Sequence, residues 1–211
     1  LTEFKFSYKV VKMRFGFGIK SQLGNAFQVL NYRLDQMLIG GLLGPQYLGV
    51  YVVASKTAEF FKIITLSIVF VLEPVLSKLE KTQAVNFVKG NLLKAFGFNF
   101  IFILLGALIA PYAIPIVFDS WSSASVPIFQ ILLIGIFISG SNGLFASFFL
   151  GQGLPQYVTL ATGFTVVFSV SSNFLLIPVF GVTGAAYSSV ISYLTLSLSY
   201  ASLFAYSNKK I

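Results

Sequence analysis

The sequence predicts an all-α integral membrane protein, a bundle of six transmembrane helices. Hydrophobic residues make up 56% of its 211 residues and charged residues only 9%, whereas a soluble domain carries about 25% charged residues. The apolar residues gather in six long stretches, and most Lys and Arg lie in alternate gaps between them. A soluble fold of this length could not bury so much apolar surface, but a bilayer can cover it.

Each stretch is long enough to cross about 30 Å of hydrocarbon, which takes about 20 residues. The predicted spans run near residues 19–43, 47–72, 87–110, 126–150, 156–177 and 183–206. Residues 1–18 form a basic segment before the first span, and residues 207–211 form a tail after the last. Pro and Gly are predicted to mark the gaps. These are Gly44, Pro45, Pro74, Pro111, Pro115, residues 151–155 and residues 178–181.

Basic residues predict the orientation of these spans. Eleven Lys and Arg lie before the first span, around the second gap and after the last span, and none lies in the loops around Pro45, Phe118 and Val179. Because cytoplasmic loops carry an excess of Lys and Arg, both termini are predicted to be cytoplasmic. The eleven are Lys5, Lys9, Lys12, Arg14, Lys20, Lys78, Lys81, Lys89, Lys94, Lys209 and Lys210.

The composition also excludes several kinds of chemistry. The chain has no Cys and no His, which excludes disulfides, zinc sites built on Cys or His, Cys nucleophiles and His-based catalysis. The net charge of +8 lies mostly just outside the apolar stretches, as topology signals and contacts to lipid headgroups do. No recognition helix is present, so nucleic acid is not expected as a partner. No cofactor or metal is expected either.

The first two spans contain five charged residues, Arg33, Asp35, Lys56, Glu59 and Lys62. A charge at the centre of a bilayer costs about 2.5–3.5 kcal/mol on insertion scales. Five such side chains facing lipid would cost on the order of 10 kcal/mol or more. We therefore expect them to face other helices or a water-filled cavity.

Helical spacing predicts how these residues are arranged. Lys56, Glu59 and Lys62 are three residues apart, so they share one broad face and adjacent members can form ion pairs. Arg33 and Asp35 are two residues apart, roughly 200° around a helix, so both cannot point into one cavity in a regular helix. The first span also carries a polar stripe at helical spacing. Its members are Asn25, Gln28, Tyr32 and Asp35.

Two interpretations of the charged residues remain open from the sequence. They are either ion pairs that hold two helices together, or the lining of a polar cavity for a charged substrate or a coupling ion. With Glu73 at the inner end of the second span, three acidic residues balance three basic ones. A simple anion site would be net positive, and the sequence leaves open whether Asp35 or Glu59 is protonated.

The last three spans carry no formal charge. Small hydroxyl residues at helical spacing allow helices to approach closely and to share hydrogen bonds, so we expect these stripes to serve packing. The stripe of the fifth span is Thr162, Thr165, Ser169 and Ser172, and that of the sixth is Ser188, Ser192, Thr195, Ser199 and Ser202.

Several segments resemble the bacterial polysaccharide and O-antigen flippases of the multidrug/oligosaccharidyl-lipid/polysaccharide exporter superfamily. They are YRLDQMLIG at 32–40, LLG at 42–44, LGVY at 48–51, PVLSK at 74–78 and NFLLIP at 173–178, followed by Gly181 and GAA at 184–186. The resemblance covers nearly the whole chain.

This resemblance implies a two-lobed transporter of twelve or more helices, of which this chain is similar to the C-terminal six-helix lobe. The chain starts at Leu1 rather than Met, and we expect it to be a fragment that lacks an N-terminal lobe. Such transporters move undecaprenyl-pyrophosphate-linked oligosaccharides across the bacterial inner membrane for polysaccharide, lipopolysaccharide and O-antigen biosynthesis. They work by alternating access, and some relatives couple transport to H⁺ or Na⁺.

We therefore predict a flippase lobe that needs no covalent chemistry and is not an enzyme. Basic side chains would bind the pyrophosphate, polar side chains the sugar, and carboxylates the coupling ion. The predicted substrate-binding residues are Arg33, Lys56, Lys62, Asn25 and Gln28, and the predicted ion-coupling residues are Asp35 and Glu59.

Three alternatives belong to other functional classes. A cation-coupled exporter of drugs or metabolites from the same superfamily would use the two carboxylates to bind substrate. A membrane enzyme acting on the same lipid carrier would need acidic or His clusters in its loops, where Asp119 is the only outward acid. A membrane scaffold without transport would leave the intramembrane charges unexplained.

Overall fold

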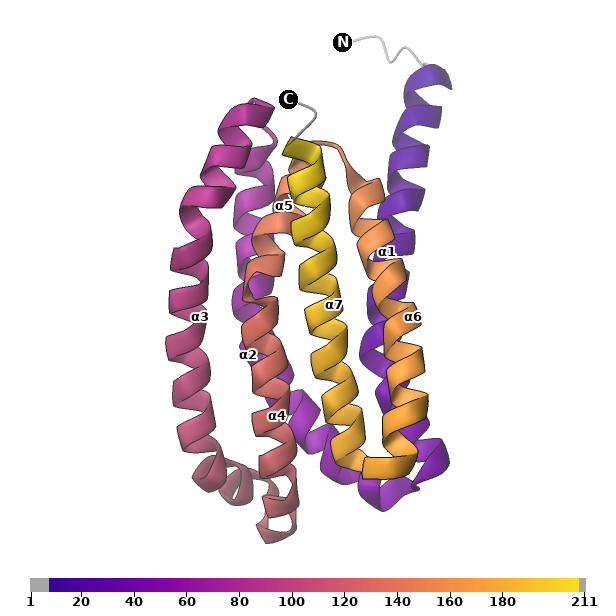
Figure 1. Cartoon of the computed structure of the whole chain (residues 1–211), viewed down its shortest axis with the longest axis vertical. Helices are drawn as coiled ribbons and strands as arrows, with labels where there is room; N and C mark the ends of the chain where they lie inside the picture. Colours follow the sequence, from indigo (N-terminus) through magenta and orange to yellow (C-terminus); the bar gives the residue numbers. More distant parts are fainter. Residues whose placement is uncertain (1–7, 209–211) are drawn as a thin grey trace, which may run out of the picture.

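The computed structural model describes residues 8–208, which form an all-α bundle without strands. This confirms the predicted fold class. Long helical segments run side by side, and the start of α1 and the end of α7 lie at the same end of the bundle (Figure 1). In chain order the elements are α1 (Tyr8–Leu42), α2 (Pro45–Leu76), α3 (Lys81–Phe118), the 3₁₀ turn η1 (Ser120–Ala124), α4 (Ser125–Ile138), the 3₁₀ turn η2 (Ser139–Ser141), α5 (Asn142–Gly151), α6 (Pro155–Phe180) and α7 (Val182–Asn208).

Within the described residues, four segments are long and apolar enough to cross a bilayer. They are α3, residues Ser122–Gly151 (which contain α4 and α5), α6 and α7, and they make this a multi-pass membrane protein. Helices α1 and α2 have 35 and 32 residues and carry the five charged residues Arg33, Asp35, Lys56, Glu59 and Lys62. That these two also span the membrane, giving six spans with cytoplasmic termini, stays a prediction.

Four of the prolines that the sequence predicted to lie in gaps are inside helices, so that prediction is wrong. Pro74 lies in the last turn of α2 and Pro178 in the last turn of α6. Helix α3 continues through Pro111 and Pro115 to Phe118. The reason is that a proline removes a single backbone N–H, and membrane helices tolerate this where neighbouring groups satisfy the freed carbonyl.

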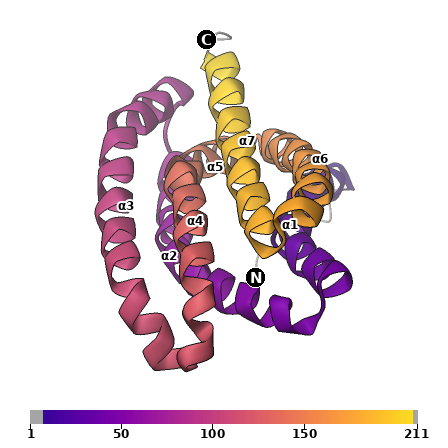
Figure 2. The same cartoon turned by 60° about the horizontal axis from the view of Figure 1, so that its bottom comes forward.

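The packing order places α7 at the centre of the bundle. Helix α7 packs against α6 on one side and α4 on the other, while α1 packs mainly on α6 and α2 mainly on α4 and α5. A tilted view shows α7 lying between these two groups (Figure 2). Helices α1 and α2 share only limited contact, less than α1 shares with α6 or α2 with α5.

Part of the hydroxyl stripes of the last helices lies at the α6–α7 contact, as expected for packing, whereas Thr195 and Ser202 are not buried. The hydroxyls of Ser172 and Ser188 are 2.6 Å apart, and the Ser188 hydroxyl donates to the carbonyl of Ser169 at 3.3 Å. All three residues are buried. The glycine Gly184 brings the two backbones still closer, because a Cβ there would lie 2.2 Å from the carbonyl oxygen of Leu176.

The apolar segment Ser122–Gly151 is broken at η2. Side chains from other helices donate hydrogen bonds to the carbonyls at this break. The Asn99 amide of α3 donates to the carbonyls of Ile136 and Phe137 at 3.2 and 3.5 Å. The Ser197 hydroxyl of α7 donates to the carbonyl of Ile138 at 3.0 Å. An unsatisfied backbone group is costly in hydrocarbon, so these two side chains stabilise the break.

Replacing Asn99 with leucine should therefore destabilise the fold by about 0.5–1.5 kcal/mol, the net contribution of a hydrogen bond. The loss stays this small because the hydroxyl and the backbone N–H of Ser139 still donate to the carbonyls of Ile136 and Phe137. The thermal transition of the detergent-purified protein measures the effect. The matched control is Asn91→Leu on the same helix, since the Asn91 amide donates to the carbonyl of Phe87 one turn earlier. Equal transitions for the two variants would contradict this role of Asn99.

Candidate functional site

A buried carboxylate, Asp35 of α1, lies where α1, α2 and α7 meet. The Tyr51 hydroxyl of α2 donates to one of its oxygens, and the Ser189 hydroxyl of α7 donates to the same oxygen at 3.3 Å. The backbone N–H of Gln36 donates to the other oxygen at 2.7 Å. Asp35 is 7% exposed and Tyr51 fully buried. Three helices thus provide hydrogen bonds to a single buried acid.

A small cavity opens beside Asp35 between α1, α2, α4 and α7. It holds about 20 Å³, which is room for one water molecule. Apolar walls come from α4, and the remaining lining is mostly polar. The polar lining includes Asp35, Tyr51, Glu59, Lys62, Ser189 and Tyr193.

Lys62 lies in this cavity with both carboxylates. Its ammonium group is 4.7 Å from the centroid of the Tyr193 ring, a distance at which the ring face attracts a cation. Glu59 lies one turn earlier on α2 and accepts a 2.6 Å ion pair from Lys56. These two side chains are 44% and 35% exposed, so the ion pair forms the outer edge of the site and Lys62 its inner part.

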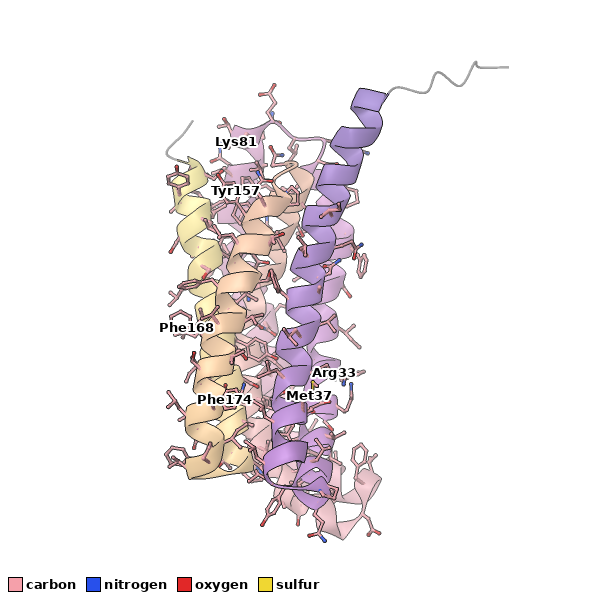
Figure 3. The ribbon with its side chains drawn as sticks, turned by 90° about the vertical axis from the view of Figure 1, so that its right-hand side faces the viewer. Arg33, Met37, Lys81, Tyr157, Phe168 and Phe174 are labelled. Carbon is pink, nitrogen blue, oxygen red and sulfur yellow. The ribbon has the colours of Figure 1, made fainter. Side chains whose placement is uncertain are left out.

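Arg33 lies outside the cavity, as the 200° separation from Asp35 predicted. Its side chain is exposed and projects from α1 away from α6 (Figure 3). Its guanidinium donates to the side-chain oxygen of Gln36 at 3.1 Å, and the Gln36 amide donates to the Ser55 hydroxyl of α2 at 3.3 Å. This chain of hydrogen bonds links Arg33 of α1 to Ser55 of α2.

The predicted sugar-binding residues, Asn25 and Gln28, lie closer to the N-terminal end of α1 than Asp35 does. Asn25 is exposed and ten residues before Asp35, which corresponds to about 15 Å of helix. It does not line the cavity. The side chain of Gln28 lies outside the described part of the structure. The structure therefore does not gather all seven predicted residues at one point.

The position of Glu73 changes the charge balance. It is fourteen residues beyond Glu59 on α2, about 21 Å along the helix axis. Near the cavity there remain three basic residues (Arg33, Lys56 and Lys62) and two acidic ones, which gives a formal charge of +1. The neutrality that Glu73 suggested from the sequence thus does not apply to the site.

Three residues of the site were missed by sequence reasoning. Tyr51 is part of the LGVY segment, which drew attention to the family resemblance but not to a contact with Asp35. Ser189 lies beside the hydroxyl stripe of α7 rather than on it, and Tyr193 is one turn further. Nothing local in the sequence indicates that this face of α7 meets α1 and α2.

Comparison with known proteins identifies the family. A family described as "Polysaccharide biosynthesis protein" matches residues 2–125, which is more than half of the chain and includes all five charged residues discussed above. The chain belongs to the polysaccharide biosynthesis protein family. This membership confirms the resemblance that the sequence motifs indicated.

Solved structures show that the polysaccharide biosynthesis protein has the fold of one transporter lobe. A multidrug resistance MATE family transporter of the MOP superfamily, in an outward-facing conformation, matches with a TM-score of 0.58 at 22% identity. A MOP superfamily transporter from Pyrococcus furiosus, described as having a binding pocket of reversed polarity, matches with 0.61 at 19%. Each match covers 87% of this chain and 42% of the other.

A curated relative gives the same picture. An uncharacterized membrane protein of Methanocaldococcus jannaschii is 26% identical over 193 residues, which are 89% of this chain and 38% of the relative. The chain therefore spans about two fifths of the proteins that it matches.

Proposed function

We propose that this polysaccharide biosynthesis protein forms one lobe, by position the C-terminal one, of a flippase for lipid-linked oligosaccharides. A second, N-terminal lobe would complete the central cavity. The observation that carries the proposal is the group of five ionisable side chains on α1 and α2, whose formal charge is +1 and whose basic members Arg33 and Lys56 are exposed. Charges within a membrane are costly and typically line a substrate or ion path.

The exposed basic residues suit a pyrophosphate. Arg33 and Lys56 are exposed on neighbouring helices, and each has donors beyond its bond to Gln36 or Glu59. Charge-assisted hydrogen bonds to phosphate are among the strongest in proteins. Lys62 would supply further positive charge from inside the cavity. Asn25 and Gln28, further along α1, would contact the sugar.

The carboxylates are the proposed coupling groups. Asp35 offers two oxygens beside the hydroxyls of Tyr51 and Ser189, and Glu59 lies across a space that can hold one water. A proton or Na⁺ bound here would cancel negative charge and leave the site more positive for the anionic substrate. The transporter would then change between its inward-facing and outward-facing states according to whether the carboxylates hold a proton or Na⁺. The proposed location is the bacterial inner membrane with both termini cytoplasmic.

A cation-coupled exporter of drugs or metabolites is the second candidate. It is favoured by the partly exposed Glu59 and the hydrogen-bonded Asp35, which could bind an organic cation directly. In that case the loss of Arg33 or Lys56 would leave transport unchanged, and a knockout strain would gain sensitivity to cationic drugs.

The variants Arg33→Ala and Lys56→Ala test the flippase. In the full-length protein, each should lower export of lipid-linked oligosaccharide at least about tenfold, because a hydrogen bond to a charged group contributes about 1.5–3 kcal/mol. Surface polysaccharide, normalised to the amount of protein in the membrane, is the readout. The control is Lys78→Ala, an exposed basic residue just after α2. Wild-type export by both test variants would rule out this site.

A further inference from the structure

An apolar groove lies between α2 and α3, on the opposite side of α2 from the charged cavity. Its volume is about 300 Å³, and its lining is almost entirely apolar. The floor is an aromatic cluster in which the Phe61 ring lies 4.9 Å from the Phe102 ring and 5.7 Å from the Phe129 ring. The rim is exposed, with Phe60, Leu105 and Ile109 each more than half accessible.

Gly106 of α3 allows the groove to have this floor. A Cβ at this position would lie 2.4 Å from the Phe61 ring, so any larger residue would push the ring out of its place against α3. Phe61 is held on its other sides by the neighbouring aromatic rings. The groove is therefore bounded by a packed wall and does not arise from a loose surface side chain.

Lys56 separates the groove from the charged cavity on the exposed side of α2. At about 100° per residue, Lys56 lies about 40° from Phe60 and about 60° from Glu59 around the helix. Phe60 lines the groove and Glu59 lines the cavity. The exposed, basic side chain of Lys56 therefore lies between the apolar groove on one side and the polar cavity on the other.

The lining and surroundings of the groove favour a hydrocarbon chain as the occupant. Its walls offer almost no polar surface, so a polar ligand would lose its hydrogen bonds to water without gaining others. Only 17% of the most apolar part of α3 is buried, so this helix lies next to lipid. An anionic group at the head of such a chain would meet Lys56.

We propose that the groove binds the polyprenyl chain of the lipid-linked substrate while its phosphate lies at Lys56 and its saccharide at the cavity. This inference rests on the proposed function and adds to it a place for the lipid part of the substrate. Transport would then depend on the length of the chain, because a short prenyl chain leaves the groove empty.

The test compares two substrates in proteoliposomes that contain the full-length protein. One is an undecaprenyl-pyrophosphate-linked saccharide, and the other carries the same saccharide on a short prenyl chain. Ala113→Trp fills the groove from α3, and Ala201→Trp makes the same change at an exposed position of α7 away from the groove. We expect Ala113→Trp to slow transport of the long-chain substrate at least about tenfold and to leave transport of the short-chain substrate unchanged. A tenfold loss corresponds to about two methylene groups that no longer fit in the groove.

The possible results with the two substrates separate the groove assignment from the proposed function. Equal slowing of both substrates by Ala113→Trp, or no slowing of the long-chain one, overturns the groove assignment and leaves the proposed function intact. Failure of the wild-type protein to move either substrate overturns the proposed function and the groove assignment together. Slowing by Ala201→Trp equal to that by Ala113→Trp also overturns the assignment, since bulk alone would then explain the effect.

A binding measurement separates the substrate from ordinary bilayer lipid. Phe60→Trp places a fluorophore at the rim of the groove, and brominated phosphatidylcholine vesicles quench it. Added undecaprenyl phosphate should displace the brominated chains and restore fluorescence, and the further change Lys56→Ala should remove this recovery. If no recovery occurs with Lys56 present, the groove holds bilayer lipid and the proposal is wrong.

Discussion

Replacing Asp35 with asparagine should abolish most transport while the protein remains folded in the membrane. Asparagine has nearly the same shape, and its side-chain oxygen can still accept from Tyr51 and Ser189. It cannot carry the negative charge that faces Lys62 or exchange a proton or cation. We expect a transport rate at least about tenfold lower, a change of about 1.4 kcal/mol in the barrier. Rates in proteoliposomes and the amount of folded protein are the measurements.

The matched control is Asp119→Asn at the end of α3. Asp119 is exposed and has a φ of 73°, a conformation that asparagine tolerates well. Transport should not change. Wild-type rates for Asp35→Asn would show that Asp35 has only a packing role, which is the ion-pair interpretation that the sequence left open. Arg33→Ala beside Asp35→Asn, each as a single variant, also separates the two candidates, since both candidates need Asp35 but only the flippase needs Arg33.

Replacing Gly184 with alanine should have the largest effect on stability. The new Cβ would lie 2.2 Å from the carbonyl oxygen of Leu176 and 3.0 Å from the amide nitrogen of Ile177. Both are backbone atoms of α6, so no side-chain rotation relieves the clash and the α6–α7 pair must separate. Overpacking costs about 1–3 kcal/mol and occasionally more, and we expect the upper part of this range. Thermal denaturation of the purified protein measures it.

Gly49→Ala is the control for Gly184. The segments around these glycines look alike in the sequence, since each opens a helix with two glycines and a tyrosine. However, a Cβ at Gly49 meets nothing within 4 Å, and alanine in a helix is favoured over glycine by about 0.5–1 kcal/mol. Gly49→Ala should therefore be neutral or stabilising. A similar loss of stability in both variants would contradict the close contact of α6 and α7.

The membrane class, the helical fold and the key charged residues were predictable from the sequence because they depend on local composition. The transfer of apolar residues into hydrocarbon adds up along a segment, whatever its neighbours are. The separation of Arg33 from Asp35 and the pairing of Lys56 with Glu59 follow from helix geometry within one segment.

Only the tertiary structure decided which residues meet across helices. The contact of Tyr51 and Ser189 with Asp35 joins residues up to 154 positions apart, and it depends on how α7 is rotated against α1 and α2. That rotation is set by close contacts such as the one at Gly184, which a composition does not reveal. The same holds for the break at η2, where Asn99 satisfies carbonyls of a segment 37 residues away. Burial energy is additive along the chain, whereas contacts between helices depend on the packing of the whole bundle.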